Sequence, residues 1–394
     1  MDQLFKALEE EFDNMVDFRR DMHMYPELSH HEEKTPEKIA QFYKDLGVED
    51  IQTKVGGRGV VATLEGGKPG RTVALRADFD ALPIQDAKDV EYRSRVDGVM
   101  HACGHDIHTS TLLHVAKVLF ANKDQVPGKV VFLHQFAEEV IPGGAKFMIE
   151  DGALDGVDGV FGAHVISTMP YGKVGALPGA FMASGDTFEI TVQGKGGHAG
   201  MPQHNKDPLT VGTTLFQSLQ TIVSRDTDPL KSGVVSVTTF NTGEANFNVI
   251  PDKVEIKGTV RTLDDDTRDN AERSIKEMTA HIAKAYGMSA EVDYTRGYPV
   301  VVNDEDETAR ISRLQKEVMG EDNVIDITPQ TSMEDFGYYL LERPGCFFIV
   351  GGTMEDKEDV YPHHHPNFNV DERSMINIGK MFIATVFDYN GEEG

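Results

Sequence analysis

The feature that most constrains this fold is a change of hydrophobic pattern near residue 183. Before it, from about residue 35 to 180, helical stretches alternate with short, Val-rich strands that lack a two-residue period. Such strands are buried on both faces, which is typical of a mostly parallel sheet covered by helices. After it, residues 187–193 alternate between apolar and polar, as in a half-exposed strand. The pattern therefore predicts two different kinds of domain.

The elements expected on either side of this change define their order along the chain. In the first region we expect strands at 59–64, 72–77, 129–136 and 159–163, with helices at 109–121 and 144–150. The second region gives a strand, helix, two strands, helix and strand at 187–193, 208–224, 234–241, 252–261, 266–286 and 290–296. This β-α-β-β-α-β order is ferredoxin-like. Helices at 305–319 and near 333–341, a strand at 346–350 and a helix from residue 372 complete the chain. We predict an α/β domain with a mostly parallel mixed sheet, formed by residues 1–182 and 299–394 and interrupted by an α+β domain at 183–298.

Length and composition exclude several classes of protein. A chain of 394 residues is too long for one ordinary core, which agrees with two domains. Its net charge of −27 argues against binding to nucleic acid or to anionic membranes. Two cysteines, Cys103 and Cys346, cannot form a disulfide framework, and neither a signal peptide nor a membrane-spanning run is evident. We expect a cytoplasmic protein.

Polar residues follow several of the predicted strands. Asp78 and Asp80 follow strand 72–77, Glu138 and Glu139 follow strand 129–136, and His164 follows strand 159–163. The run His363–His364–His365 follows strand 346–350 across an acidic loop. Because the carboxyl ends of parallel strands meet at one edge of a sheet, we expect these side chains to converge.

The stretch HACGHDIH, residues 101–108, adds a thiol and further imidazoles. Cys103 and His105 suit a transition metal, and a helix beginning near Thr109 is expected to lower the pKa of the thiol. His164 or the Glu138–Glu139 pair alone is more often an ordinary buried or surface feature, and the Cys103/His105 pair alone fits a small buried thiol as well as a metal site. Together they predict a two-metal site, in which one of two adjacent carboxylates binds metal and its neighbour transfers a proton.

The chain resembles the amidohydrolase branch of the aminoacylase and carboxypeptidase metallopeptidase family, which includes hippurate hydrolases, N-acyl-amino-acid deacetylases and auxin–amino-acid conjugate hydrolases. The resemblance runs over nearly the whole chain. Its blocks include LRADFDALPI, HACGHDIHTSTLL, FAEEVIPGGAKFMIEDG, GKGGHAGMP, MEDFGYYL and HHHPNFNVDE.

The resemblance implies a set of metal ligands and supporting groups. Two divalent ions, zinc or manganese, would be held by Cys103, His105, Glu139, His164 and His364. His363 and His365 remain alternatives to His364, and the acidic spacer before this run departs from the family pattern. Glu138 takes the position of the general base. Asp80 matches a carboxylate that orients a ligand, Asp106 is expected to support the site in the same way, and His101 and His108 are interpreted as support or helix surface.

The inserted domain resembles the family's lid and dimerisation domain. His198 would reach the site of a neighbouring subunit and polarise the scissile carbonyl, so we expect a homodimer or a larger homo-oligomer. Asn248 and Arg261 match positions that hold the acyl or carboxylate end of the substrate. The implied activity is hydrolysis of the amide bond of N-acyl amino acids or short peptides by a hydroxide formed at the metals.

Three other functions are compatible with parts of the sequence. Aminopeptidase or carboxypeptidase activity on dipeptides fits the same site, and a more remote alternative is a metal-binding assembly protein without activity. Residues 194–199 also satisfy the dinucleotide-binding pattern G-x-G-x-x-A. That pattern must open a helix, however, and Pro202 and the polar residues after it argue against one.

Overall fold

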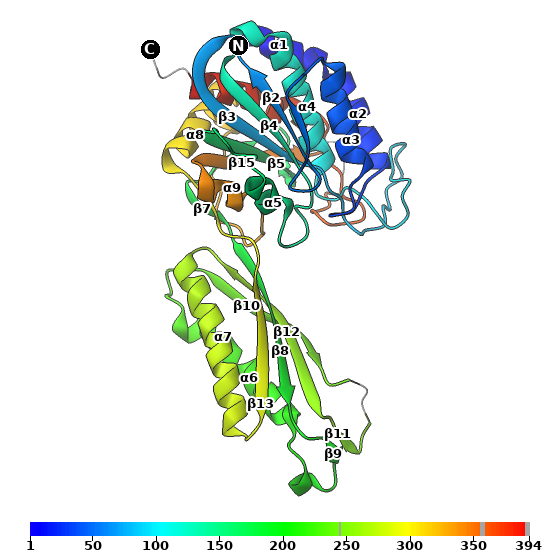
Figure 1. The fold of residues 1–394 in the computed structure, drawn as a ribbon, viewed down its shortest axis with the longest axis vertical. Coiled ribbons are helices and arrows are strands. Elements are labelled where there is room, and N and C mark those ends of the chain that lie inside the picture. The colour runs from blue at the N-terminus through cyan, green and yellow to red at the C-terminus, as the bar shows by residue number, and fades with distance from the viewer. Residues whose placement is uncertain (244–245, 355–358, 391–394) are drawn as a thin grey trace. The chain divides into compact units, whose positions relative to one another are not determined.

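The chain forms two compact units, described here by a computed structural model of residues 1–243, 246–354 and 359–390 (Figure 1). Unit 1 comprises Met1–Gly179, Val302–Thr328 and Asp335–Gly394, and unit 2 comprises Ala180–Val301 and Pro329–Glu334. The segment Pro329–Glu334 was expected in the first domain. It joins unit 2 because the Ala183 N–H donates to the carbonyl oxygens of Gln330 and Ser332, both at 3.0 Å. The chain passes between the units in β7 (Gly179–Met182) and β14 (Val301–Asn303), and again before and after Pro329–Glu334.

Unit 1 is built on a seven-stranded mixed sheet, which confirms the predicted fold class. Its central strands β4, β3, β5 and β15 are parallel, and the edge strands are joined through antiparallel pairs. Residues 73–78 of β3 are all buried, so both faces of the sheet are covered. In spatial order the strands are β1 (Ile51–Val55), β2 (Gly59–Glu65), β4 (Pro127–Gln135), β3 (Lys68–Asp78), β5 (Gly159–Pro170), β15 (Gly345–Thr353) and β6 (Val174–Gly175).

The helices of unit 1 cover this sheet. They are α1 (Asp2–Glu10), α2 (Phe12–Met24), α3 (Lys34–Asp45), α4 (His105–Ala121), α5 (Gly144–Glu150), α8 (Glu305–Met319), α9 (Gly337–Glu342) and α10 (Ser374–Tyr389). Helix α4 packs against α2, α10 and β3, and residues 105–116 of it are all buried. It begins at His105, not near Thr109 as predicted, because Gly104 takes a left-handed conformation with φ 92° and starts the helix there. His105 therefore lies in the first turn of α4.

Unit 2 has the predicted ferredoxin-like fold. Its antiparallel sheet has the order β10-β12-β8-β13, and two helices cover one face. Along the chain the elements are β8 (Ser184–Gln193), α6 (Pro208–Thr221), β10 (Gly233–Asn241), β12 (Lys253–Thr262), α7 (Asp265–Ala285) and β13 (Ser289–Arg296). A small two-stranded extension pairs β9 (Gly197–His198) with β11 (Val249–Ile250).

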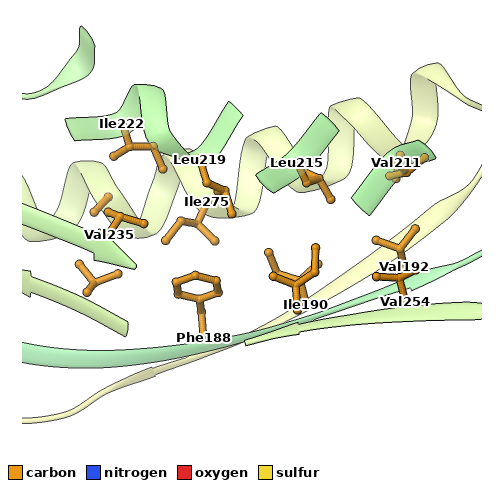
Figure 2. Packing of buried hydrophobic residues seen from close by; sticks show 14 residues of the cluster. Phe188, Ile190, Val192, Val211, Leu215, Leu219, Ile222, Val235, Val254 and Ile275 are labelled. Carbon is orange, nitrogen blue, oxygen red and sulfur yellow. The ribbon is translucent and has the colours of Figure 1, made fainter. Parts of the chain in front are cut away.

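The core of unit 2 follows from the two periodicities in its sequence. Alternate residues of β8, including Phe188 and Ile190, point toward the helices (Figure 2). Side chains spaced four residues apart on α6, those of Val211, Leu215 and Leu219, pack against them. All five side chains are buried. Residues 194–199 lead into β9 and a short 3-10 turn, so the glycine-rich pattern there does not open an α-helix. Among the helices of the described ranges, none combines the length and apolar character needed to cross a bilayer.

Candidate metal centre

The candidate site lies in unit 1, at the carboxyl ends of the parallel strands, where polar residues follow several strands. Asp80 follows β3, and Glu138 and Glu139 follow β4. His164 lies within β5, which continues to Pro170 instead of ending at residue 163 as predicted. Cys103 precedes α4, and His364 arrives from the loop after β15. Residues 355–358 of the acidic spacer before the histidine run lie outside the described residues.

Donor atoms from these segments converge in three overlapping groups. Within each group the ligand atoms lie within 4.8 Å of one another. The groups are Cys103, His105 and His164; Cys103, Glu139 and His364; and His105, Glu138 and Glu139. Because Cys103, His105 and Glu139 are shared between groups, the donors can serve two adjacent ions.

Individual distances show how tightly the donors face each other. The Sγ of Cys103 lies 3.4 Å from Nε2 of His164, and Nε2 of His364 lies 3.2 Å from Oε1 of Glu139. The Nε2 of His105 lies 3.9 Å from both Glu138 Oε2 and Glu139 Oε1. Within the described chain, His105 Nε2 is buried without a hydrogen-bond partner, and Asp78 Oδ2 lies 3.6 Å from it. A buried polar atom without a partner is costly, and a cation between this nitrogen and the surrounding carboxylates would satisfy it.

The electrostatics of the site also fit a bound cation. Burial, reinforced by the carboxylates of Glu139, Glu138 and Asp78, raises the pKa of the Cys103 thiol well above its usual range. The sequence predicts that the start of α4 lowers the pKa of this thiol. That prediction is wrong, because the protein groups around Cys103 raise the pKa. Burial opposes the charged ring of His105, but the carboxylates of Asp78 and Asp80 raise its pKa to about 10. Divalent ions among these groups would favour the thiolate and the neutral imidazole, the forms that bind metal.

Asp80 connects three parts of the site. Its Oδ1 lies 3.1 Å from Nδ1 of His105, and its Oδ2 accepts the Ser29 hydroxyl at 2.6 Å and the Glu139 N–H at 3.0 Å. The ring of His105 is thereby oriented with Nε2 toward the other donors.

Two further residues of the HACGHDIH stretch have other partners. His108 is buried, its Nδ1 lying 2.7 Å from Asp78 Oδ1 and its Nε2 accepting the Val165 N–H at 3.0 Å. Both of its ring nitrogens are therefore occupied. Asp106 Oδ2 lies 2.8 Å from both Arg19 Nε and His23 Nδ1, so these bonds tie α4 to α2 instead of orienting a candidate ligand.

The three histidines of the C-terminal run are used differently. His363 is half-buried against the ring of His164, with Nδ1 3.6 Å from Cys103 Sγ and Nε2 accepting the Ser167 N–H at 3.4 Å. His364 adopts a left-handed backbone with φ 63° and directs Nε2 to Glu139. His365 stacks on Tyr361 with ring centroids 4.5 Å apart. The geometry thus brings His364 into the donor groups and leaves His363 beside them.

The remaining candidates lie in unit 2. His198 is exposed on β9, and the carbonyl of Asn248 accepts the Ala199 N–H at 2.9 Å, so these two residues are neighbours. Arg261 lies near the far end of β12, where it lines a cavity of about 280 Å³ with Lys231. Eight strand residues separate Arg261 from the β9–β11 extension, a distance of roughly 26 Å.

Sequence reasoning missed a buried polar network beside the site. Arg76 donates to Asp78 at 2.6 Å, to Asp335 at 2.9 Å and to Gln135 at 2.9 Å. Burial raises the pKa of Asp335 to about 6 even with Arg76 beside it. A signal was present, because Arg76 stands within the apolar run of β3, where an arginine requires buried acceptors.

Thiol, imidazole and carboxylate donors at the edge of a parallel sheet, with a spare carboxylate beside them, define a metal-binding hydrolase. Comparison with known proteins makes this class specific. The sequence profile of peptidase family M20/M25/M40 matches residues 74–387, and the chain belongs to this family.

Two family members and one crystal structure are similar to this protein over nearly its whole chain. Thermostable carboxypeptidase 2 of Saccharolobus solfataricus is 39% identical over 384 residues, covering 97% of this chain and 96% of the relative. N-acetyl-L-cysteine deacetylase of Bacillus subtilis is 40% identical over 362 residues, covering 92% of this chain and 85% of the relative. The crystal structure of Bacillus subtilis YxeP, described as a dinuclear metal-binding peptidase, is 32% identical with a TM-score of 0.83, covering 97% and 99% of the two chains. The chain is thus a hydrolase of a family that acts on amide bonds, and the alternative of an assembly protein without activity loses its support.

Proposed function

We propose that this protein hydrolyses the amide bond between an acyl group and an amino acid, using two divalent ions, zinc or manganese, held by Cys103, His105, Glu139, His164 and His364. The observation that carries the proposal is the position of Glu138. Its carboxyl group lies 3.9 Å from His105 Nε2, in the donor group that it forms with His105 and Glu139, and Glu139 is the next residue in the chain. A carboxylate at this position can exchange protons at the centre while its neighbour binds metal.

The donor set suits these ions. A thiolate with imidazoles favours zinc, whereas carboxylates also accommodate manganese. When bound, such ions supply Lewis acidity, which lowers the pKa of a water and polarises a carbonyl oxygen. Glu138 takes the proton released by the attacking water and returns it to the leaving nitrogen, and Asp80 holds His105 and the Glu139 N–H in place throughout.

The residues of unit 2 bind and polarise the substrate. Arg261 suits the substrate carboxylate, because its guanidinium lines a cavity that also contains Lys231. Asn248 would hold the acyl end, and His198 would polarise the scissile carbonyl. Since roughly 26 Å separates His198 from Arg261 along β12, one copy of unit 2 cannot bring both to the same small substrate. A partner subunit therefore supplies His198.

An apolar edge of unit 2 supports this oligomer. Phe216 on α6 and Phe240 on β10 are 42% and 38% exposed. The ring of Phe240 lies against Gly212, one helical turn before Phe216, so the two aromatics share the α6–β10 edge. A homodimer, or a larger homo-oligomer, would cover these side chains.

The shape of the substrate pocket, and not the metal ions, determines which amide is hydrolysed. The similarity to an N-acetylcysteine deacetylase favours N-acyl amino acids, whereas the similarity to a carboxypeptidase favours dipeptides or carboxyl-terminal residues. A cytoplasmic location remains part of the proposal, because Cys103 and Cys346 are both free thiols.

A substrate panel tests the chemistry. Acetyl-, benzoyl- and dipeptide amides are assayed with metal-reconstituted protein whose metal content is measured on the same sample. Glu138→Gln should lower kcat by about 10²–10⁴-fold with the metal retained, whereas Glu189→Gln, at an exposed carboxylate of β8, should not. Comparable kcat in Glu138→Gln would refute the assigned proton transfer.

Mixing inactive subunits tests the role of His198. Equimolar Glu138→Gln and His198→Ala chains, refolded or co-expressed together, should recover about one quarter of wild-type activity, because half of the dimers then contain one complete site. No recovery in mixed dimers, or full activity of a monomer by light scattering, would contradict the trans role of His198.

A further inference from the structure

The segment between α2 and α3 lies across both turns that supply the carboxylates of the site. The Ala81 N–H donates to the Glu27 carbonyl at 2.9 Å, and Leu28 forms a parallel bridge with Ala81. Ser29 then donates to Asp80 at 2.6 Å. Residues 27–29 are therefore fixed to the turn after β3, next to the candidate metal centre.

The end of this segment reaches the turn after β4. Oε1 of Glu32 accepts the N–H of Ala137 at 2.9 Å, and the Glu32 side chain is fully buried. Ala137 has a left-handed backbone with φ 51°, a conformation that residues other than glycine rarely adopt. Its carbonyl accepts the Gly144 N–H at 3.1 Å. The peptide groups on both sides of Ala137 are thus held by hydrogen bonds.

Glu138 and Glu139 follow immediately from this turn. The Glu139 N–H donates to Asp80, and Asp80 is held in turn by Ser29. The direction in which both carboxylates project therefore depends on the backbone angles of Ala137, and Glu32 is the side chain bonded to the Ala137 N–H.

We infer that Glu32 is a positioning residue for the Glu138–Glu139 pair: its carboxyl group holds the Ala137 N–H and so fixes the left-handed turn from which both side chains project. The inference rests on the proposed function for the roles of Glu138 and Glu139. Glu32 is itself anchored, because Arg58 Nη1 donates to the Glu32 carbonyl oxygen at 2.5 Å.

The surroundings of Glu32 decide which substitutions test this role. Glu32, Arg58 and Phe136 line a cavity of about 1020 Å³, from which water could reach the Ala137 N–H if the side chain were shortened. Leucine keeps most of the volume and removes the acceptor. Burial, with the Asp80 carboxylate, raises the pKa of Glu32 to about 8, so glutamine mimics the neutral side chain at pH 7 and keeps the acceptor oxygen.

The experiment compares Glu32→Leu and Glu32→Gln in the full-length protein, with Glu307→Leu as the control. Glu307 is another buried glutamate of unit 1, paired with Arg310 at 2.8 Å on α8. The readouts are Tm, Zn²⁺ affinity by competition with a chromophoric chelator, and kcat and KM at saturating metal. Glu32→Leu should weaken Zn²⁺ affinity or lower kcat by about 10–100-fold with KM nearly unchanged. Glu32→Gln should stay within about threefold of wild type in both. Glu307→Leu should lower Tm while kcat and Zn²⁺ affinity of the folded protein are retained.

A glycine at residue 137 supplies a second, independent test. Glycine adopts the left-handed conformation without steric cost, so the turn then depends less on its hydrogen bond. The loss caused by Glu32→Leu should be smaller in the Ala137→Gly background than in wild type.

Each outcome decides between the two claims. If Glu32→Leu keeps both kcat and Zn²⁺ affinity, or if Glu32→Gln loses as much as Glu32→Leu, the positioning role is overturned while the activity stands. If the wild-type protein binds Zn²⁺ but hydrolyses none of the amides, the proposed function fails. A selective loss of Zn²⁺ affinity in Glu32→Leu would still support the positioning role in that case.

Discussion

Replacing Arg76 by leucine should destabilise unit 1 by about 3–5 kcal/mol, the usual effect of removing one partner from a buried ion pair. The Arg76 side chain is 1% exposed. Its guanidinium donates to Asp78 at 2.6 Å, to Asp335 at 2.9 Å and to Gln135 at 2.9 Å. Leucine would leave two fully buried carboxyl groups without their nearest cation.

The expected loss is large relative to the stability of a typical domain, about 5–15 kcal/mol. In a unit of this size, each kcal/mol shifts Tm by about 2–4 °C, so we expect unit 1 to melt roughly 6–20 °C lower. The matched control is Arg296→Leu, which removes an exposed arginine that pairs with Asp269 and Glu272 at 2.6 Å. Pairs of this kind contribute about 0–1 kcal/mol.

Calorimetry of both variants at pH 5 and pH 8, with matched metal content, gives the test. In wild type the pKa of Asp335 is already raised to about 6 by burial, and losing Arg76 raises it further. The folded variant then keeps a proton that the unfolded chain releases, so its stability falls as the pH rises through this range. The Arg76→Leu loss should therefore be greater at pH 8 than at pH 5. A loss below 1 kcal/mol, or the same loss at both pH values, would refute this reasoning.

Three other predictions concern the same region. Asp80→Asn should weaken Zn²⁺ affinity by about 10–100-fold, since it disturbs the acceptor for His105 Nδ1, and a chelator competition giving wild-type affinity would contradict this. The folded-state pKa of Glu32, about 8, exceeds the usual value of about 4.3, so wild-type stability should fall by up to about 1.4 kcal/mol per pH unit between these values. Glu32→Gln should flatten this fall in Tm between pH 5 and pH 9, and parallel Tm curves would argue against it. His364→Ala should weaken Zn²⁺ affinity more than His363→Ala, and the reverse order would assign the ligand to His363.

The order of elements could be predicted because local patterns record it. The strict alternation of β8 and the four-residue spacing on α6 identify the ferredoxin-like unit without reference to distant residues. The start of α4 could not be placed in this way, because residues 105–110 contain a single apolar residue, Ile107, and therefore show no apolar stripe. Their burial comes from packing against α2, α10 and β3, which no local pattern records.

The same distinction applies to the residues around the site. Strand ends indicated Asp80, Glu138 and Glu139, since the topology of a parallel sheet fixes where such residues meet. Glu32 gave no such signal. It stands among polar residues in a loop, and its role arises from one hydrogen bond to Ala137, more than a hundred residues away in the chain.

Whether the second ring nitrogen of a histidine is already hydrogen-bonded within the protein distinguishes the candidate ligands from the supporting residues. In His105, Nδ1 is bonded to Asp80 while Nε2 faces the other donors without a hydrogen-bond partner among the described residues. His164 is arranged likewise, with Nδ1 2.8 Å from the Val165 carbonyl and Nε2 facing Cys103. In His108 both nitrogens are bonded within the protein, to Asp78 and to the Val165 N–H. A ligand needs one nitrogen held by the protein and the other left for metal, so His105 and His164 meet this condition and His108 does not.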